Sequence, residues 1–189
     1  MINNKNIICD PNDILRKTAQ AVELPLSLQD RQILDEMIEY VRNSKDPKLC
    51  QELDLSGAVG IAAPQIGINK QMCVINVDHF DNEGNVTKTD EFALVNPKII
   101  AKSQKLAALK NGEGCLSIKQ PHPGLVYRPY KLVVEAYDYL SNKNITINAT
   151  GYLAIVIGHE IDHLKGILFY DHINKKDPFR EIPNSLLIE

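Results

Sequence analysis

Hydrophobic residues in the first third of the chain recur with the period of a helix. The repeating positions are Ile33, Leu34, Met37, Ile38 and Val41. This spacing lines one helical face, and Ser27 followed by Asp30 resembles a capping pattern ahead of it, so we predict a helix that begins at Ser27. The polar segment 43–56 contains Asp46-Pro47 and predicts a surface loop or insertion.

Five later segments are short and rich in β-branched or aromatic residues, which is typical of strands. They are Met72–Val77, Phe92–Val95, Lys98–Ala101, Tyr130–Tyr139 and Ile145–Ala149. Turn-forming residues at 81–85 and 141–144 bound them, and Asn96-Pro97 is expected to break one from the next. The alternation within Tyr130–Tyr139 indicates an antiparallel strand with one face more buried than the other.

The run Tyr152–Lys165 predicts a second, mostly buried helix, with Gly166 in a position that favours its end. Strands therefore cluster between two helices without a regular β-α-β alternation, which predicts an α+β fold. With 189 residues, of which 44% are hydrophobic, the chain is long enough for a substantial core but short for two enzyme domains. We expect residues 1–189 to form a single domain.

Charge and composition limit the classes of partner. A net charge of −3 gives no overall basic field, so direct nucleic-acid recognition is not indicated. The longest apolar run, Tyr152–Ile157, is far shorter than the roughly 20 residues that cross a bilayer, and the polar start lacks the apolar core of a signal peptide. Four widely separated cysteines include no CxxC pair, which fits a reducing, cytoplasmic location.

The strongest chemical signal is the HExxH sequence at 159–163, within the second predicted helix. Residues four apart share one helical face, so the imidazoles of His159 and His163 can converge on one metal ion. Glu160 lies close enough to reach a metal-bound water without being a ligand. A chance pairing on a solvated face is less favoured, because the helix is mostly apolar and buried ionisable groups need partners.

A catalytic site of this type needs a third protein ligand. A metzincin pattern places Gly166 correctly but has Phe169 where its third histidine belongs, and the glutamates available to a thermolysin-like site lie in a short tail with little helical character. Cys115, placed among glycines at 111–117, is a better candidate. Taken alone, Cys115 fits an inert, buried thiol better than a ligand, because free cysteines are among the most buried residues.

Three ordered motifs together resemble the peptide deformylase family. They are EGCLS at 113–117, HEIDH at 159–163, and AVGIAAPQ at 58–65, which matches a GxGxAAxQ segment. The resemblance runs from about Asp10 to Ile173. Two positions depart from the pattern: Ala58 replaces the usual first glycine, and Gly158 replaces a glutamine that commonly precedes the first histidine.

The resemblance implies antiparallel sheets packed around a central metal-binding HExxH helix. It also implies a metal-dependent hydrolase that removes the N-formyl group from the N-terminal methionine of newly synthesised polypeptides and releases formate. The implied metal ligands are Cys115, His159 and His163. Fe(II) is the expected working metal, with zinc, nickel or cobalt able to occupy the site.

The same resemblance assigns roles around the metal. Glu160 would accept a proton from the attacking water and deliver it to the leaving amine. The Gln65 side chain and the Leu116 N–H would stabilise the oxyanion, although Gln65 alone could be a turn-capping amide. The substrate-binding candidates are Val59, Gly60 and Gly114, which would pair with the substrate backbone, and Ile155 and Val156, which either line a methionine pocket or pack the core.

The expected partner is the N-formylmethionyl nascent peptide, and the mildly basic segment 174–178 leaves a transient ribosome contact open. Two rival functions remain: an HExxH metallopeptidase that cleaves internal peptide bonds, and a metal-binding protein without turnover. Arg128 and Glu113 are expected either to brace the Cys115 loop or to form an exposed ion pair. The remaining histidines have no ligand spacing to the motif and are assigned surface or loop roles; they are His79, His122 and His172.

Overall fold

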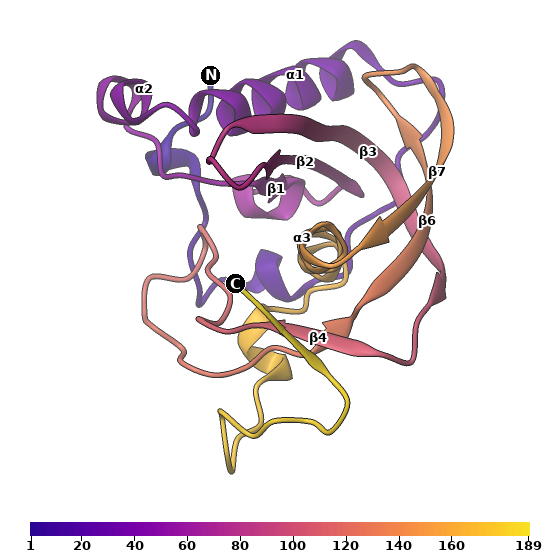
Figure 1. Cartoon of the computed structure of the whole chain (residues 1–189). Helices are drawn as coiled ribbons and strands as arrows, with labels where there is room; N and C mark the ends of the chain where they lie inside the picture. The colour runs from indigo at the N-terminus through magenta and orange to yellow at the C-terminus, as the bar shows by residue number, and fades with distance from the viewer.

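The computed structural model describes all 189 residues and is built around a curved, five-stranded antiparallel sheet (Figure 1). In spatial order its strands are β1 (Gly60–Ala62), β2 (Met72–Phe80), β3 (Val86–Lys102), β6 (Lys131–Asp138) and β7 (Lys143–Thr150). A smaller sheet contains β5 (Arg128–Pro129), β4 (Leu106–Leu109) and β8 (Leu186–Ile188). All pairs are antiparallel except β4 with β8.

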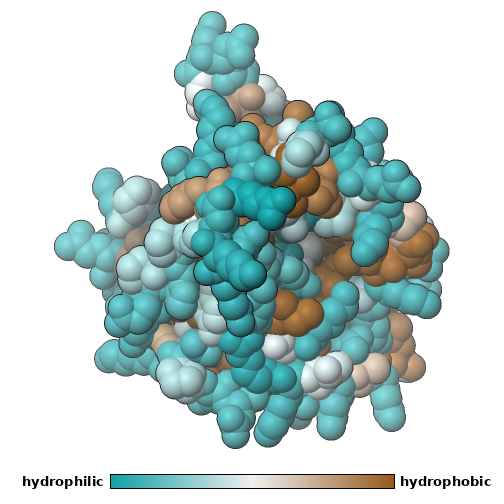
Figure 2. Space-filling view, turned by 90° about the horizontal axis from the view of Figure 1, so that it is seen from below, coloured by the Kyte–Doolittle hydropathy of each residue, from teal (hydrophilic) through white to brown (hydrophobic).

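The chain also contains three α-helices and four short 3₁₀ helices. The α-helices are α1 (Leu28–Asn43), α2 (Pro47–Leu53) and α3 (Tyr152–His163). The 3₁₀ helices are η1 (Asn4–Asn6), η2 (Asp13–Arg16), η3 (Ala63–Ile66) and η4 (Phe169–His172). None of the helices is long and apolar enough to cross a membrane. The face opposite α1 is mostly hydrophilic, with separate hydrophobic patches (Figure 2).

Helix α1 covers one face of the large sheet, and α3 lies on the other face, in the middle of the molecule (Figure 1). Strand β2 packs against both because its side chains alternate between faces. Met72 and Val74 belong to the hydrophobic cluster on the α1 side, whereas Cys73 and Ile75 belong to the cluster that includes Ile157 and other residues of α3. Two cores thus meet at one strand and fix α3 against the sheet.

The predicted helices and the α+β class are confirmed. The Ser27 hydroxyl accepts a hydrogen bond from the Asp30 N–H at 3.1 Å, so α1 begins where the capping pattern predicted. Helix α3 ends at His163, two residues earlier than predicted, and Gly166 adopts φ +72° just beyond its end. The central HExxH helix expected from the family resemblance is α3.

The loop predicted over 43–56 is wrong in its middle, where α2 forms. The Asp46 carboxylate accepts a hydrogen bond from the Lys48 N–H at 2.8 Å, and Pro47 occupies the first turn of the helix. An Asp-Pro pair can break structure or begin a helix, since a capping carboxylate followed by proline at the first helical position favours the start. Asp46-Pro47 therefore does mark a structural boundary, but it begins a helix where a loop was predicted.

The predicted break at Asn96-Pro97 is also wrong, because β3 continues through it. The pairing with β6 shifts register between Val95 and Lys98, so the proline lies at an irregularity that does not need its N–H. Asn96 adopts φ +53°, and its side chain bonds both the N–H and the C=O of Val22 at 2.8 Å. A side chain distant in sequence thus stabilises the irregular strand.

Gly166 is the position where a side chain would be most damaging. A Cβ there would lie 2.4 Å from the Arg16 carbonyl oxygen, and the φ of +72° is itself unfavourable for other residues. We expect Gly166→Ala to lower the free energy of unfolding by at least about 2 kcal/mol, measured by urea denaturation. Gly84→Ala is the control, because Gly84 has φ +86° but open space around it. If both variants lose equal stability, the contact with Arg16 contributes nothing.

Candidate active site

Helix α3 and the loop between β4 and β5 bring three metal-ligand side chains together. The Nε2 atoms of His159 and His163 lie 3.2 Å apart, and the Cys115 Sγ lies 3.3 Å from the His163 Nε2. All three ligand atoms fall within 4.8 Å of one another. The three ligands predicted from the sequence therefore converge, although 44 residues separate Cys115 from the first histidine.

These distances suit a tetrahedral metal site. Ideal metal–nitrogen and metal–sulfur bonds at tetrahedral angles place two nitrogens about 3.3 Å apart and a nitrogen and a sulfur about 3.6 Å apart. The observed 3.2 Å and 3.3 Å fall within a few tenths of an ångström of these values. One thiolate and two imidazoles leave a fourth position for water or substrate, as catalytic sites require.

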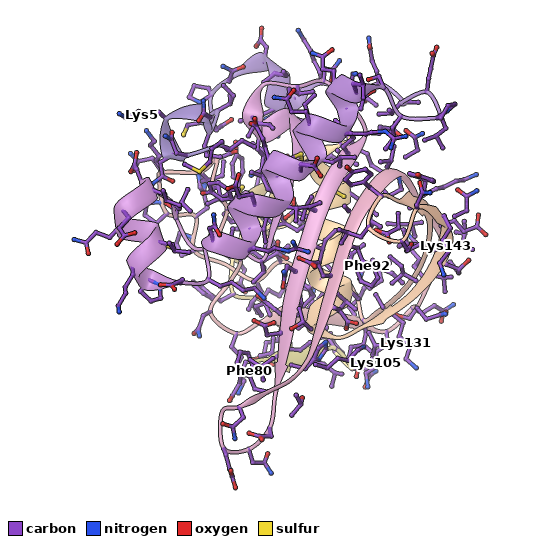
Figure 3. All side chains as sticks on the ribbon, turned by 90° about the horizontal axis from the view of Figure 1, so that it is seen from above. Lys5, Phe80, Phe92, Lys105, Lys131 and Lys143 are labelled. Atoms are coloured by element: carbon purple, nitrogen blue, oxygen red, sulfur yellow. The ribbon has the colours of Figure 1, made fainter.

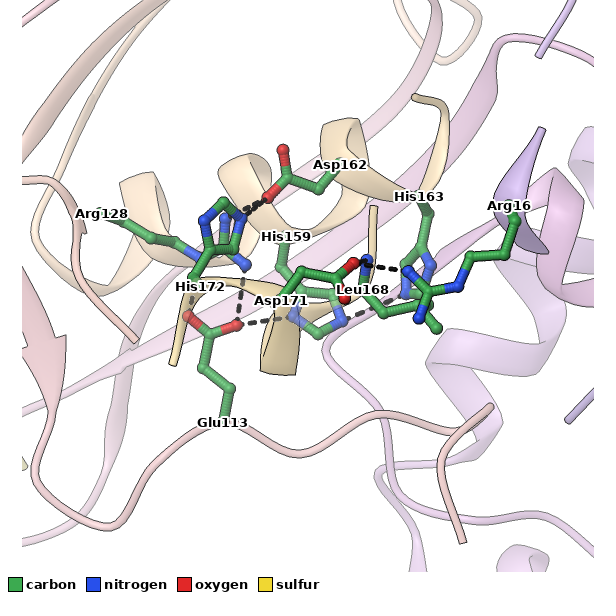
Figure 4. Close-up of polar contacts among 9 residues, drawn as sticks. All are labelled: Arg16, Glu113, Arg128, His159, Asp162, His163, Leu168, Asp171 and His172. Carbon is green, nitrogen blue, oxygen red and sulfur yellow. Dashed lines mark hydrogen bonds and ion pairs between the residues drawn. The ribbon is translucent and has the colours of Figure 1, made fainter. Parts of the chain in front are cut away.

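A buried charge network holds the first histidine in place (Figure 4). The His159 Nδ1 lies 2.7 Å from a Glu113 carboxylate oxygen, which leaves Nε2 directed at the metal position. Arg128 donates two hydrogen bonds to Glu113, at 2.6 and 3.0 Å, and one to Asp162 at 2.6 Å. Arg128 and Glu113 were expected either to brace the Cys115 loop or to form an exposed ion pair. Their side chains are only 5% and 3% exposed, so the brace is confirmed.

Burial also sets the protonation of the site. It raises the pKa of Glu160 from 4.5 to about 7, which suits a group that must both accept and release a proton near neutral pH. One oxygen of Glu160 and the Nδ1 of His163 are buried without a hydrogen-bond partner in the chain. Unpaired buried polar atoms are expensive, and the one on Glu160 marks this region as adapted to a bound group.

Metal uptake should release a proton from His159. Burial alone would lower the pKa of this imidazole, but its hydrogen bonds with Cys115 and Glu113 raise the pKa to about 10 in the metal-free chain. A metal ligand must be neutral, so binding below pH 10 displaces a proton and apparent affinity rises with pH, about tenfold per unit for one proton. Calorimetric titration with Zn²⁺ in buffers of different ionisation enthalpy at pH 7 measures this release. Proton-independent binding would contradict the assigned charge of His159.

Gly60 lies directly against the acid/base candidate. A Cβ at this position would fall 2.6 Å from the Glu160 Oε1, so only glycine leaves room for the carboxylate. This contact between β1 and α3 explains why the predicted motif needs a glycine at 60. It also brings Gly60, predicted to pair with the substrate backbone, next to Glu160, the predicted acid/base.

The Gln65 side chain is fixed from both ends. Its Oε1 accepts a hydrogen bond from the Ala62 N–H at 2.9 Å, and its Nε2 lies 3.2 Å from the Ser117 Oγ and 3.5 Å from the Cys115 Sγ. Gln65 is therefore a turn cap that also directs its amide NH₂ at the candidate metal centre. Capping the turn and donating a hydrogen bond to an oxyanion are therefore compatible roles for Gln65.

Strand β1 forms one edge of the large sheet and faces the site. The Val59 C=O accepts a hydrogen bond from the Asn76 N–H at 2.8 Å, so by alternation the backbone groups of Gly60 point away from β2 towards the free edge. On either side of Gly60, the Ala58 N–H and C=O both bond the Ser44 hydroxyl at 3.2 Å, and the Ala62 N–H bonds Gln65. Gly60 is therefore the residue of this edge whose backbone groups remain available to hydrogen-bond an added strand.

One open cleft of about 870 Å³ joins these groups. Ten of the eleven predicted site residues line this cleft, and only His163 does not; the ten are Val59, Gly60, Gln65, Gly114, Cys115, Leu116, Ile155, Val156, His159 and Glu160. Sequence reasoning missed several lining residues: Lys45, Asp78, Phe80, Leu109, Ile118 and Tyr152.

The two departures from the family motif are accommodated locally. Ala58 is absent from the residues with positive φ, so an alanine fits its backbone without strain. Gly158 lies against the brace, because a Cβ there would meet the Arg128 Cδ at 3.4 Å and its Nη1 at 3.5 Å. The small residue gives the arginine side chain room beside α3.

The other residues weighed in the sequence have structural positions around the site. The ring of Phe169 lies beside that of His159, with centroids 6.2 Å apart and planes 17° apart, so it packs beside a candidate ligand. His172 contacts Asp162 at 2.7 Å and thereby extends the Arg128 network (Figure 4). His79 pairs with Asp90 at 2.7 Å and His122 stacks on Tyr170; neither belongs to the group of candidate ligands, as expected.

Comparison with known proteins gives consistent matches over nearly the whole chain. The family model described as polypeptide deformylase matches residues 4–179. The chain is 44% identical to peptide deformylase 2 of Bacillus subtilis over 189 residues, which covers all of both proteins. Two solved structures are similar in fold. The peptide deformylase of Ehrlichia chaffeensis has a TM-score of 0.73 at 29% identity, covering 90% of this chain and 88% of that one. The Met-Ala-Ser-bound peptide deformylase of Acinetobacter baumannii has a TM-score of 0.67 at 27% identity, covering 88% and 96%.

Proposed function

Because the chain belongs to the polypeptide deformylase family, we propose that Cys115, His159 and His163 hold its metal ion and that Glu160 carries the protons of the reaction. The family consists of metal-dependent hydrolases that remove the formyl group from the N-terminal methionine of newly made polypeptides, and this is the activity of the chain. The observation that carries the residue assignment is the convergence of three ligand atoms within 4.8 Å beside a buried carboxylate.

A metal ion held by Cys115, His159 and His163 would supply Lewis-acid chemistry to water and to the formyl oxygen. Glu160 accepts the proton of the attacking water and delivers it to the amine nitrogen as the formyl C–N bond breaks. Burial holds the pKa of Glu160 near 7, so the same group serves as base and then as acid. The products are formate and a peptide with a free amino terminus.

Two donors are proposed to stabilise the negative charge that develops on the formyl oxygen. The Gln65 amide is held in position by Ala62 and Ser117, and the Leu116 N–H has no hydrogen-bond partner within the chain. A preorganised donor of this kind typically contributes a factor of about 10² to 10³ in turnover. Both donors lie next to Cys115: the Gln65 Nε2 is 3.5 Å from its Sγ, and Leu116 follows it in the chain.

The substrate is proposed to add a short strand to the free edge of β1. Gly60 offers its backbone groups, and Gly114 lines the same cleft. Val59 was also expected to pair with the substrate backbone, but its C=O already bonds Asn76, so we propose that it contributes its side chain instead. Ile155 and Val156 are proposed to line the methionine pocket, since both reach the cleft one turn before His159. Main-chain pairing explains how one site could accept many downstream sequences.

We also propose that residues 1–189 act as one catalytic domain, because the two hydrophobic clusters share strand β2. Fe(II) is the proposed metal in the cell, and zinc, nickel or cobalt would fit the same thiolate and imidazole ligands. A cytoplasmic location is supported by four unpaired cysteines. A transient ribosome contact through the exposed Lys175 and Lys176 is a further proposal, tested by salt-dependent cosedimentation with ribosomes.

The decisive experiment compares three peptides with the same sequence. Formyl-Met-Ala-Ser should release formate, whereas acetyl-Met-Ala-Ser and unblocked Met-Ala-Ser should remain intact, with metal content measured on anaerobically purified protein. Cleavage of an internal bond in any of them would favour the rival metallopeptidase. Metal binding without formate release would favour the rival binding protein.

A further inference from the structure

The cleft extends well beyond the residues used in the proposed reaction. Its far end is lined by Lys45 and by Asp78 and Phe80 of β2, none of which lies near the metal ligands in sequence. The pairing of β1 with β2 reaches only to the Val59–Asn76 hydrogen bond, so Asp78 and Phe80 project past the start of β1. At this end, the cleft is therefore lined by residues of β2 beyond its pairing with β1.

The β2–β3 hairpin carries Phe80 away from the body of the protein (Figure 3). The ring is 63% exposed, and Val86, its partner across the hairpin, is 54% exposed. A bulge between His79 and Phe80 changes the register at this point, and such bulges redirect side chains. The Asp81 carboxylate accepts hydrogen bonds from the backbone of the turn at 2.9 Å, which keeps the hairpin formed.

The polar groups at the far end already have partners. The Lys45 ammonium bonds the Asn76 amide and lies 2.6 Å from the Asp78 carboxylate, so this pair carries no net charge. The Ser44 hydroxyl is occupied by the backbone of Ala58. The group without a partner is the Phe80 ring, which favours an apolar or aromatic contact.

The direction of the substrate follows from the two ends of the groove. Its formyl end must lie beside Cys115 and Glu160, near Gly60, so the peptide must run from there towards the start of β1. Gly60 pairs with Ile75, and Phe80 lies five positions further along β2, or roughly 17 Å at about 3.4 Å per residue. An extended peptide covers this distance in about five residues.

We infer that Phe80 contacts an apolar side chain at about the fifth residue of the formylated peptide and makes the enzyme sensitive to sequence beyond the residues at the metal. This inference rests on the proposed function. It assigns a specificity role to the hairpin, which contributes nothing to the chemistry itself.

The test uses formylated peptides of three and six residues, with a single leucine or aspartate placed at position four, five or six of the longer ones. For the native chain, kcat/KM should be about three- to fivefold higher with leucine than with aspartate at one of these positions, the size expected for a partly exposed apolar contact between strands. Phe80→Ser should abolish that preference and leave kcat/KM for formyl-Met-Ala-Ser within twofold of the native value. Leu28→Ser is the control, because Leu28 is 88% exposed on α1 outside the cleft.

The outcomes separate this inference from the proposed function. If formyl-Met-Ala-Ser is not hydrolysed by the native chain, the proposed function fails. If it is hydrolysed but leucine and aspartate are equivalent at all three positions, or if Phe80→Ser keeps the preference, only the role of Phe80 is overturned. An equal loss on short and long peptides would also overturn it, because that result indicates a general effect of the hairpin on the fold.

Discussion

Glu160→Gln should retain its metal and lose at least about 100-fold in turnover, with a loss of up to about 10⁴-fold consistent with removal of a general acid/base. The amide has nearly the same shape as the carboxylate, so it fits beside Gly60, but it cannot accept the proton of the attacking water. KM should change much less than kcat, because the cleft and the β1 edge remain.

The measurements are formate release over a range of peptide concentrations and metal content per chain. Glu39→Gln is the matched control, because Glu39 is exposed on α1 and far from the cleft. Loss of metal from Glu160→Gln would make Glu160 a ligand or a structural support. Near-native turnover would refute the proposed proton transfer.

Cys115→Ala should bind metal at least about 100-fold more weakly than the native chain. Mutation of a residue that hydrogen-bonds a metal ligand typically lowers metal affinity by about 10- to 100-fold. Cys115→Ala removes a ligand itself, and the only anionic one. Titration with Zn²⁺ against a competing chelator measures the change, and circular dichroism checks that the fold persists.

Cys9→Ala serves as the control for removal of a thiol, since Cys9 is outside the group of candidate ligands and its Sγ hydrogen-bonds the Ile7 carbonyl oxygen at 3.7 Å. This variant should keep native affinity. Full metal occupancy of Cys115→Ala at low free zinc would remove Cys115 from the ligand set and reopen the choice of third ligand.

The sequence predicted the elements that carry strong local signals. The capped, periodic helix from Ser27 and the apolar helix containing His159 were both found, and the chemistry was readable because HExxH fixes two ligands on one helical face. The third ligand could not be obtained from spacing alone. It needed the family resemblance, because the approach of the Cys115 loop to α3 depends on how the two sheets pack.

Apart from α2, the predictions that were wrong or left open are those where tertiary contacts decide the outcome. The side chain of Asn96 bonds Val22, 74 residues earlier, and no local pattern reveals that this contact carries β3 through a proline. Similarly, whether Arg128 forms a buried brace or a surface ion pair depends on its contact with Asp162 of α3, which is distant in sequence. Phe80 was overlooked for the same reason, since its position at the end of the cleft depends on where the pairing of β1 stops.

The capped edge of β1 has a consequence for solubility. A sheet with an open edge is a template for pairing with other chains, and long exposed edges promote aggregation. Here Ser44 occupies the backbone of Ala58 and Gln65 occupies that of Ala62, so the unprotected stretch is reduced to Gly60. An edge of one residue can accept a bound peptide that is also held by the opposite wall, but it is too short to nucleate a growing stack of strands. At β1, the protein therefore keeps the proposed strand-binding edge open while it exposes little backbone of that strand to other chains.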